Sequence, residues 1–250
     1  MWFNALFWGL VAGSALIIGS AMGYYLHIPV RLVAAIMGFG SGVLISVLAF
    51  SLMEEAYGHG GFAYTAIGFL AGASIFTAAN IYLSRRGARH RKRSRAGKQA
   101  MESERPGSGL AIAIGSLLDD IPESIAVGLT LISGGAVSIV VVIGIFLSNI
   151  PEALSSAAGM KKANRSARYI FGVWGATALA CGASSLLGYV VFASLPEETI
   201  AVTLAIAAGA ILAMLADTML PEAFEEAHEL SGIVVVMGFL IAFILGKWAG

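Results

Sequence analysis

Residues 42–58, GVLISVLAFSLMEEAYG, and residues 209–225, GAILAMLADTMLPEAFE, share one pattern: a glycine, an apolar run and a group of acids. At a single offset of 167 their first glycines coincide, as do Glu55 and Glu222. An apolar run of about 20 residues is long enough to cross a bilayer as a helix. The recurrence therefore predicts a membrane protein in which one helical unit occurs twice.

The composition supports a polytopic membrane protein. Of the 250 residues, 58% are hydrophobic and only 12% are charged, which excludes a soluble enzyme, a nucleic-acid-binding protein and a disordered protein. The formal net charge is zero, so the charge balance identifies no partner. The single cysteine, Cys181, excludes an intramolecular disulfide and a cysteine metal cluster, and its apolar surroundings predict a small buried packing residue.

Eight apolar stretches are long enough to span the membrane, and they leave little chain for anything else. We therefore predict an all-α polytopic protein with one transmembrane domain over residues 1–250. The first stretch has no positively charged region before it, so we expect a retained span and not a cleaved signal peptide. The predicted spans are 4–26, 30–53, 61–83, 109–132, 136–159, 168–193, 199–221 and 231–249.

Lysine and arginine predict the orientation, because cytoplasmic loops carry an excess of both. Residues 84–107 hold nine of the fifteen, so this loop is expected to be cytoplasmic, and its glycines and serines predict disorder. Eight alternating spans then place Arg31 and the basic residues of 161–168 inside, only Lys247 outside, and both termini outside. The basic run also suits anionic lipid or nucleic acid, but beside a span its usual meaning is topology.

The repeat extends beyond the two opening segments. In the first and sixth spans Gly13 aligns with Gly182, and GFL recurs in the third and eighth spans at Gly68 and Gly238. Spans 1, 2 and 3 thus match spans 6, 7 and 8 in order. Three-helix units separated by two helices enter the membrane from opposite sides, which predicts inverted repeats around a central pair of helices 4 and 5.

Helices 4 and 5 carry acids in the middle of apolar spans. The fourth span contains GSLLDDIPESIAVGL and the fifth contains FLSNIPEALSSAAGM. A carboxylate at this depth costs roughly 2.5–3.5 kcal/mol even on a lenient scale, so four of them without an intramembrane lysine or arginine partner require a cation or protons. The candidate ligands are Asp119, Asp120 and Glu123 in the fourth span and Ser148, Asn149 and Glu152 in the fifth.

The spacing predicts that each trio shares one helical face. Asp119 and Glu123 are four residues apart and Asp120 and Glu123 three, and the same steps recur in the fifth span. Pro122 and Pro151 lack an amide hydrogen, which frees carbonyl oxygens one turn earlier at the same depth. Oxygen ligands are therefore expected to converge on one place in the membrane.

Acidic groups near the ends of two further spans suit a cation path, although solvated helix caps explain them about equally well. The seventh span adds Asp217 and Thr218 before another proline-glutamate pair. His27 and His90 are loop histidines without neighbouring ligands, and no role is predicted for them. The inner group comprises Glu222, Glu225, Glu226, His228 and Glu229, and the outer group comprises Glu54, Glu55 and His59.

Over essentially its whole length, the chain resembles the ZIP family of divalent-metal transporters. That family has eight spans, outward termini, a variable cytoplasmic loop between spans 3 and 4, and the signatures H-N-x-P-E-G and H-x-x-P-E-G in spans 4 and 5. These signatures fall here on DDIPES (119–124) and SNIPEA (148–153). The resemblance implies that Asp119, Asp120 and Glu123 take the ligand positions of span 4, and Ser148, Asn149 and Glu152 those of span 5.

The chain departs from the family pattern at several positions. Both signature histidines are absent, Ser185 stands where some members have an acid in span 6, and Asp217 and Thr218 stand before the L-P of span 7. An all-oxygen site is harder than the family's nitrogen-containing site and favours manganese or iron(II) over zinc, although zinc also accepts carboxylates. The same departures are compatible with a relative that no longer transports.

The sequence predicts a ZIP-like transporter that moves a divalent cation (zinc, manganese or iron(II)) toward the cytoplasm, with no organic cofactor. The expected partners are the metal cation and membrane lipid, and small-residue runs such as GSALIIGSAMG allow close helix contacts, within the chain or in a homodimer. The short loops favour a bacterial inner membrane. An intramembrane aspartyl protease using Asp119 or Asp120 with Asp217 is the alternative, but it leaves the prolines and glutamates unexplained; a noncatalytic scaffold has no reason to keep such acids.

Overall fold

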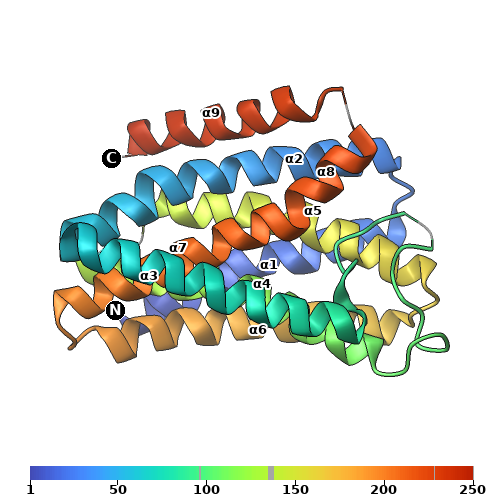
Figure 1. Cartoon of the computed structure of the whole chain (residues 1–250), viewed down its shortest axis with the longest axis horizontal. Helices are drawn as coiled ribbons and strands as arrows, with labels where there is room; N and C mark the ends of the chain where they lie inside the picture. The colour runs from blue at the N-terminus through green and yellow to red at the C-terminus, as the bar shows by residue number, and fades with distance from the viewer. Residues whose placement is uncertain (96, 135–137, 228, 250) are drawn as a thin grey trace.

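The computed structural model describes residues 1–95, 97–134, 138–227 and 229–249, and all regular elements in these ranges are helical (Figure 1). The α-helices are α1 (Trp2–Tyr25), α2 (Val30–Val47), α3 (Met53–Leu83), α4 (Ser108–Gly134), α5 (Ile139–Lys162), α6 (Ala167–Phe192), α7 (Glu197–Met214), α8 (Leu220–Ala227) and α9 (Ser231–Ala249). The same ranges contain three short π-helical turns: η1 (Leu48–Leu52) joins α2 to α3, η2 (Ser84–Ala88) follows α3, and η3 (Leu215–Met219) joins α7 to α8.

Several helical segments are long and apolar enough to cross a bilayer, as expected of a multi-pass membrane protein. Among the described residues there are six: Trp2–Tyr25, Val30–Ala88, Ile139–Lys162, Ala167–Phe192, Glu197–Glu225 and Ser231–Trp248. The helix α4 has 27 residues, but its three central acids keep it outside this apolar set. The all-helical membrane architecture predicted from the sequence is thereby confirmed.

The long segment Val30–Ala88 is folded back on itself. Its 59 residues would extend about 88 Å as one straight helix, roughly three times the hydrocarbon thickness of a bilayer. Gly61 has φ 68° and ψ −170°, a conformation that interrupts the helix and that residues with a Cβ rarely adopt. Figure 1 shows α2 and α3 leaving the same end of the molecule.

The helices α4 and α5 pack mainly against other helices and not against each other. The most extensive pairs are α3 with α7, α1 with α5, α1 with α6, α2 with α9, and α4 with α6. By contrast, α4 and α5 touch each other over few residues. The predicted central helices α4 and α5 are therefore not closely packed on each other, and the Lys92 side chain contacts Asp119 on α4 and Glu152 on α5.

Gly42 and Gly209, which align at the sequence offset of 167, bring helices into backbone contact. A Cβ on Gly42 would collide with the carbonyl oxygen of Val235 on α9, and a Cβ on Gly209 would collide with that of Phe69 on α3. Small residues at such positions allow membrane helices to approach closely. These contacts fix the α2/α9 and α3/α7 pairs.

We expect Gly209→Ala to destabilise the protein, because the added methyl group must push α7 away from Phe69. The expected cost is about 1–3 kcal/mol, measured as a lower midpoint of thermal unfolding in detergent. Gly172→Ala on α6 is the matched control, since its Cβ would meet no atom within 4 Å. Equal midpoints for the two variants would contradict this packing.

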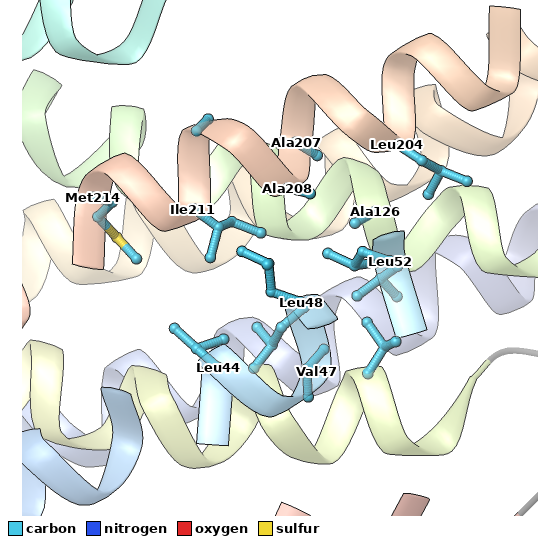
Figure 2. Packing of buried hydrophobic residues seen from close by; sticks show 14 of the residues in the cluster. Leu44, Val47, Leu48, Leu52, Ala126, Leu204, Ala207, Ala208, Ile211 and Met214 are labelled. Carbon is cyan, nitrogen blue, oxygen red and sulfur yellow. The ribbon is translucent and has the colours of Figure 1, made fainter. Parts of the chain in front are cut away.

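An apolar cluster lies largely beyond the α4 acids as seen from residues 84–107, although its member Met214 contacts Lys92 of that loop. Figure 2 shows Leu44 and Val47 of α2 and Ile211 and Met214 of α7 in this cluster, together with Ala126 of α4. Ala126 follows the acids along α4, whereas residues 84–107 precede this helix. The acids therefore lie between this apolar cluster and the basic loop.

Candidate functional site

The three acids of α4 lie inside the protein, at the middle of a helix that contains Pro122. Asp119 is 2% exposed, Asp120 is 1% exposed and Glu123 is 1% exposed. Because positions three and four residues apart share a helix face, the spacing brings the three carboxylates to one side. Their burial far from a helix end makes each of them costly unless it is neutralised.

The polar trio of α5 is also buried, at 0–1% exposure. The Ser148 hydroxyl donates to the Ile145 carbonyl at 2.9 Å, and the Asn149 amide donates to the Ala12 carbonyl of α1 at 3.3 Å. The Oδ1 atom of Asn149 has no hydrogen-bond partner in the described part of the chain. An oxygen that can coordinate a cation is thus available next to Glu152.

Two cations from the loop, which sequence reasoning missed, reach the carboxylates of both helices. The Arg91 guanidinium donates to both oxygens of Asp119, from Nε at 2.8 Å and from Nη2 at 2.7 Å. The Lys92 ammonium lies 2.8 Å from Glu152 and 3.3 Å from Asp119. Arg91 is 1% exposed and Lys92 is 3% exposed, so these are buried ion pairs.

Other carboxylate oxygens of the site remain without a partner. Neither oxygen of Asp120 and neither oxygen of Glu123 accepts a hydrogen bond from any residue that the structure describes. The same holds for Oε1 of Glu152, whose other oxygen contacts Lys92. A buried charge without a partner is strongly unfavourable, so these oxygens are suited to a ligand of positive charge.

Asp217 lies apart from this buried group and joins it only through a relay. Its carboxylate accepts from Asn80 of α3 at 3.1 Å, and the side chain itself is exposed. The Asn80 Oδ1 atom accepts from Arg91 Nη1 at 2.8 Å. The predicted ligand Asp217 is therefore connected to Asp119 through Asn80 and Arg91, and Thr218 turns its hydroxyl to the Met214 carbonyl of its own helix.

The predicted inner acidic group is occupied by the loop. Arg93 pairs with Glu222 at 2.9 Å and with Glu225 at 2.6 Å, and Lys98 pairs with Glu225 at 2.6 Å. His228 lies outside the described residues, as does the side chain of Glu226. At the predicted outer group, His59 lies 3.9 Å from Glu197.

The loop 84–107, for which the sequence predicts disorder, packs against the bundle at both of its ends. At the far end, Arg165 and the amides of Gly107 and Gly109 hydrogen-bond to the carboxylate of Glu102. These bonds lower the pKa of Glu102 to about 2, so it is ionised at neutral pH. Composition alone suggests a disordered loop, because it carries no information about the acids on the bundle with which these basic residues pair.

The sequence also singles out Cys181, Ser185 and His27. Cys181 is buried, in agreement with its expected packing role. The Ser185 hydroxyl on α6 donates to the Ala5 carbonyl at 2.8 Å. His27 lines a cavity of about 450 Å³ between the α1–α2 turn and the end of α5, beside Lys161 and Lys162. No metal role for His27 follows from this position.

No preformed metal cluster stands in the described ranges: no three His, Cys, Asp or Glu side chains there are arranged to hold one ion. Asp119 of α4 and Glu152 of α5 contact Lys92 instead. Comparison with models of known protein families and with curated proteins finds no match for the chain.

Proposed function

We propose that this protein is a ZIP-like transporter that moves a divalent metal cation across the membrane toward the cytoplasm. The observation that carries the proposal is the set of unpartnered, buried carboxylate oxygens on Asp120, Glu123 and Glu152. Hard oxygen ligands of this kind bind divalent cations. The proposed ligands are Asp119, Asp120, Glu123, Ser148, Asn149 and Glu152, with Asp217 as an acid on the route to the loop side.

Eight crossings arranged as inverted repeats fit the helix contacts. Exchanging α2 with α7 and α3 with α9 converts the α2/α9 pair into the α7/α3 pair. Exchanging α1 with α6 and α4 with α5 converts the α1/α5 pair into the α6/α4 pair. This is the pattern that a twofold axis in the membrane plane would produce, and transporters built in this way bind substrate between the halves.

Residue positions support the same repeat. The π-helical turns Leu48–Leu52 and Leu215–Met219 are separated by the offset of 167. A Cβ on Gly72 would collide with the Ile206 carbonyl, and a Cβ on Gly238 would collide with the Phe39 carbonyl. The two carbonyls, of Phe39 and Ile206, are again 167 residues apart. In these contacts Gly238 corresponds to Gly72, so the alignment of Gly238 with Gly68 through GFL has a register four residues off.

The basic residues support a cytoplasmic loop. Lys161 donates to the Tyr24 carbonyl at 2.6 Å, Lys162 donates to the Ser94 carbonyl at 2.7 Å, and Arg165 contacts Glu102. The basic segments 84–107 and 161–168 therefore gather at one end of the bundle. With positive residues inside, the termini lie outside, and we assign the protein to a bacterial inner membrane.

Uptake into proteoliposomes tests the proposal. Purified wild-type protein is reconstituted and offered Mn²⁺, Fe²⁺, Zn²⁺ or Co²⁺, with protein-free liposomes as the control. We expect saturable uptake in which Mn²⁺ or Fe²⁺ is preferred over Zn²⁺ by about tenfold, because the ligands are all oxygens. Absence of both uptake and binding for every ion, in protein that remains folded, would refute the proposal.

The protease alternative is not favoured by this geometry. It requires Asp217 to share a proton with Asp119 or Asp120. Asp217 instead accepts from Asn80, and Asp119 is held by Arg91. A transport-inactive relative would be identified by metal binding without uptake in the same experiment.

A further inference from the structure

The first part of the basic loop enters the carboxylate site. Lysine and arginine are almost never fully buried unless they are paired, yet the adjacent Arg91 and Lys92 are both within the bundle. They contact Asp119 on α4 and Glu152 on α5, the helices proposed to hold the metal. The Lys92 ammonium also lies 3.1 Å from the Met214 sulfur of α7.

Polar contacts hold the loop backbone in this position. The Ser155 hydroxyl donates to the Lys92 carbonyl at 2.5 Å, and the Ser94 amide donates to Glu222 at 3.1 Å. The Gln99 amide donates to the carbonyls of Arg91, Arg93 and Ser156 at 2.9–3.0 Å. Lys92 is therefore held on α5 and Ser94 on α8 by their backbone, so the position of Lys92 does not depend on its own ion pairs alone.

We infer that residues 91–94 form a tethered plug whose Lys92 ammonium occupies the place of the transported cation between Asp119 and Glu152. The inference rests on the proposed function and adds a regulation of the same site. A Lys92 ammonium and a divalent ion cannot both contact the same oxygens of Glu152 and Asp119. Metal bound there and the seated plug therefore exclude each other.

The plug also closes the route toward the loop side. Residues 91–94 lie between the carboxylates and the acids Glu222 and Glu225, which the loop itself neutralises. Metal that binds between Asp119 and Glu152 must displace Lys92, and the loop must move before the ion can leave toward the loop side. Because coupling between two ligands is reciprocal, metal must weaken the seating of the loop as much as the loop weakens metal binding.

Removal of the ammonium tests the competition. We expect Lys92→Ala to bind Mn²⁺ at least about fivefold more tightly than wild type. Binding is measured by calorimetry on purified full-length protein. Arg89→Ala is the control, because Arg89 is an exposed cation of the same loop and its loss removes the same charge. Wild-type or weaker Mn²⁺ affinity in folded Lys92→Ala would overturn the inference.

A labelling measurement keeps the inference falsifiable if Lys92→Ala fails to fold. In a Cys181→Ala background, Ser94→Cys is reacted with a membrane-impermeant maleimide applied to the loop side. Ser94 is 1% exposed, so we expect slow labelling that accelerates about fivefold or more when Mn²⁺ is added. Ser103→Cys, at an exposed position of the same loop, should label quickly with and without Mn²⁺.

The outcomes separate the inference from the proposed function. If wild type transports Mn²⁺ but Ser94→Cys labelling does not respond to Mn²⁺, the plug is refuted and the transporter stands. If wild type neither binds nor moves any of the four metals, the transporter itself is refuted. Tighter binding by Lys92→Ala together with Mn²⁺-dependent labelling supports both.

Discussion

Glu123→Gln is expected to abolish metal uptake and, at the same time, to stabilise the metal-free protein. Both carboxylate oxygens of Glu123 are buried without a partner among the described residues, so the ionised group costs stability that a cation or a proton must offset. Glutamine has a similar shape and no charge. We expect uptake to fall by about 100-fold or more, which corresponds to about 2.8 kcal/mol.

The stability change separates a ligand from a structural residue. A gain of about 1 kcal/mol would raise the unfolding midpoint by about 2–4 °C for a chain of this size. Wild type at 100 times its Kd for Mn²⁺ gains about 2.7 kcal/mol from binding, and the variant should lose this gain. The measurement is thermal unfolding in detergent with and without Mn²⁺.

The exposed Glu104 supplies the control for this experiment. Glu104→Gln makes the same chemical change at a loop position and should leave uptake, stability and the Mn²⁺ response unchanged. A Glu123→Gln protein that is less stable than wild type without metal would show that the carboxylate has a structural partner. Wild-type uptake in this variant would remove Glu123 from the site.

Arg91→Gln should have the opposite effect on stability. It removes two short hydrogen bonds from the buried Asp119 carboxylate and leaves that charge with Lys92 alone. Breaking a buried ion pair by removing one partner costs about 3–5 kcal/mol. We expect the unfolding midpoint to fall by about 10 °C.

A double-mutant cycle checks that this cost arises from the pair. Asp119→Asn alone should also destabilise the protein, whereas the double variant should be more stable than the sum of the two single changes predicts. Arg89→Gln controls for the loss of a loop charge. Additive effects of the two substitutions would show that Arg91 and Asp119 do not depend on each other.

Substitution of two neighbouring aspartates on α4 is expected to change stability in opposite directions. Asp119→Asn removes the partner of a buried guanidinium, whereas Asp120→Asn removes a charge whose oxygens have no partner in the described chain. Local sequence does not distinguish the two positions, since both are aspartates in an apolar run. The difference arises from which of them faces the loop.

The helices were predictable because burial in lipid demands long apolar runs. The predicted spans 4–26 and 231–249 match α1 and α9 within two residues at each end. The co-burial of Asp119, Asp120 and Glu123 followed from their spacing alone. Periodicity reports on neighbours along one helix, and for these features that information was sufficient.

The cationic half of the site was not predictable in the same way. Nine basic residues in one loop indicate membrane topology. The local sequence does not distinguish Arg91 and Lys92, the two that are buried, from the other seven. The available signal was the charge imbalance: the four acids in the middle of the fourth and fifth spans had no lysine or arginine at the same depth to pair with them. Asn80 carried a similar signal, as a lone amide in the apolar run TAANIYL.

The paired π-helical turns bear on the history of the chain. A π-helical turn holds one residue more than the α-helical turn that it replaces. If the two halves descend from a duplicated segment, η1 and η3 share the offset because the extra residue was inserted before the duplication. Otherwise the same single-residue insertion happened twice at the same place. A relative that lacks the extra residue in one half only would then record a later deletion.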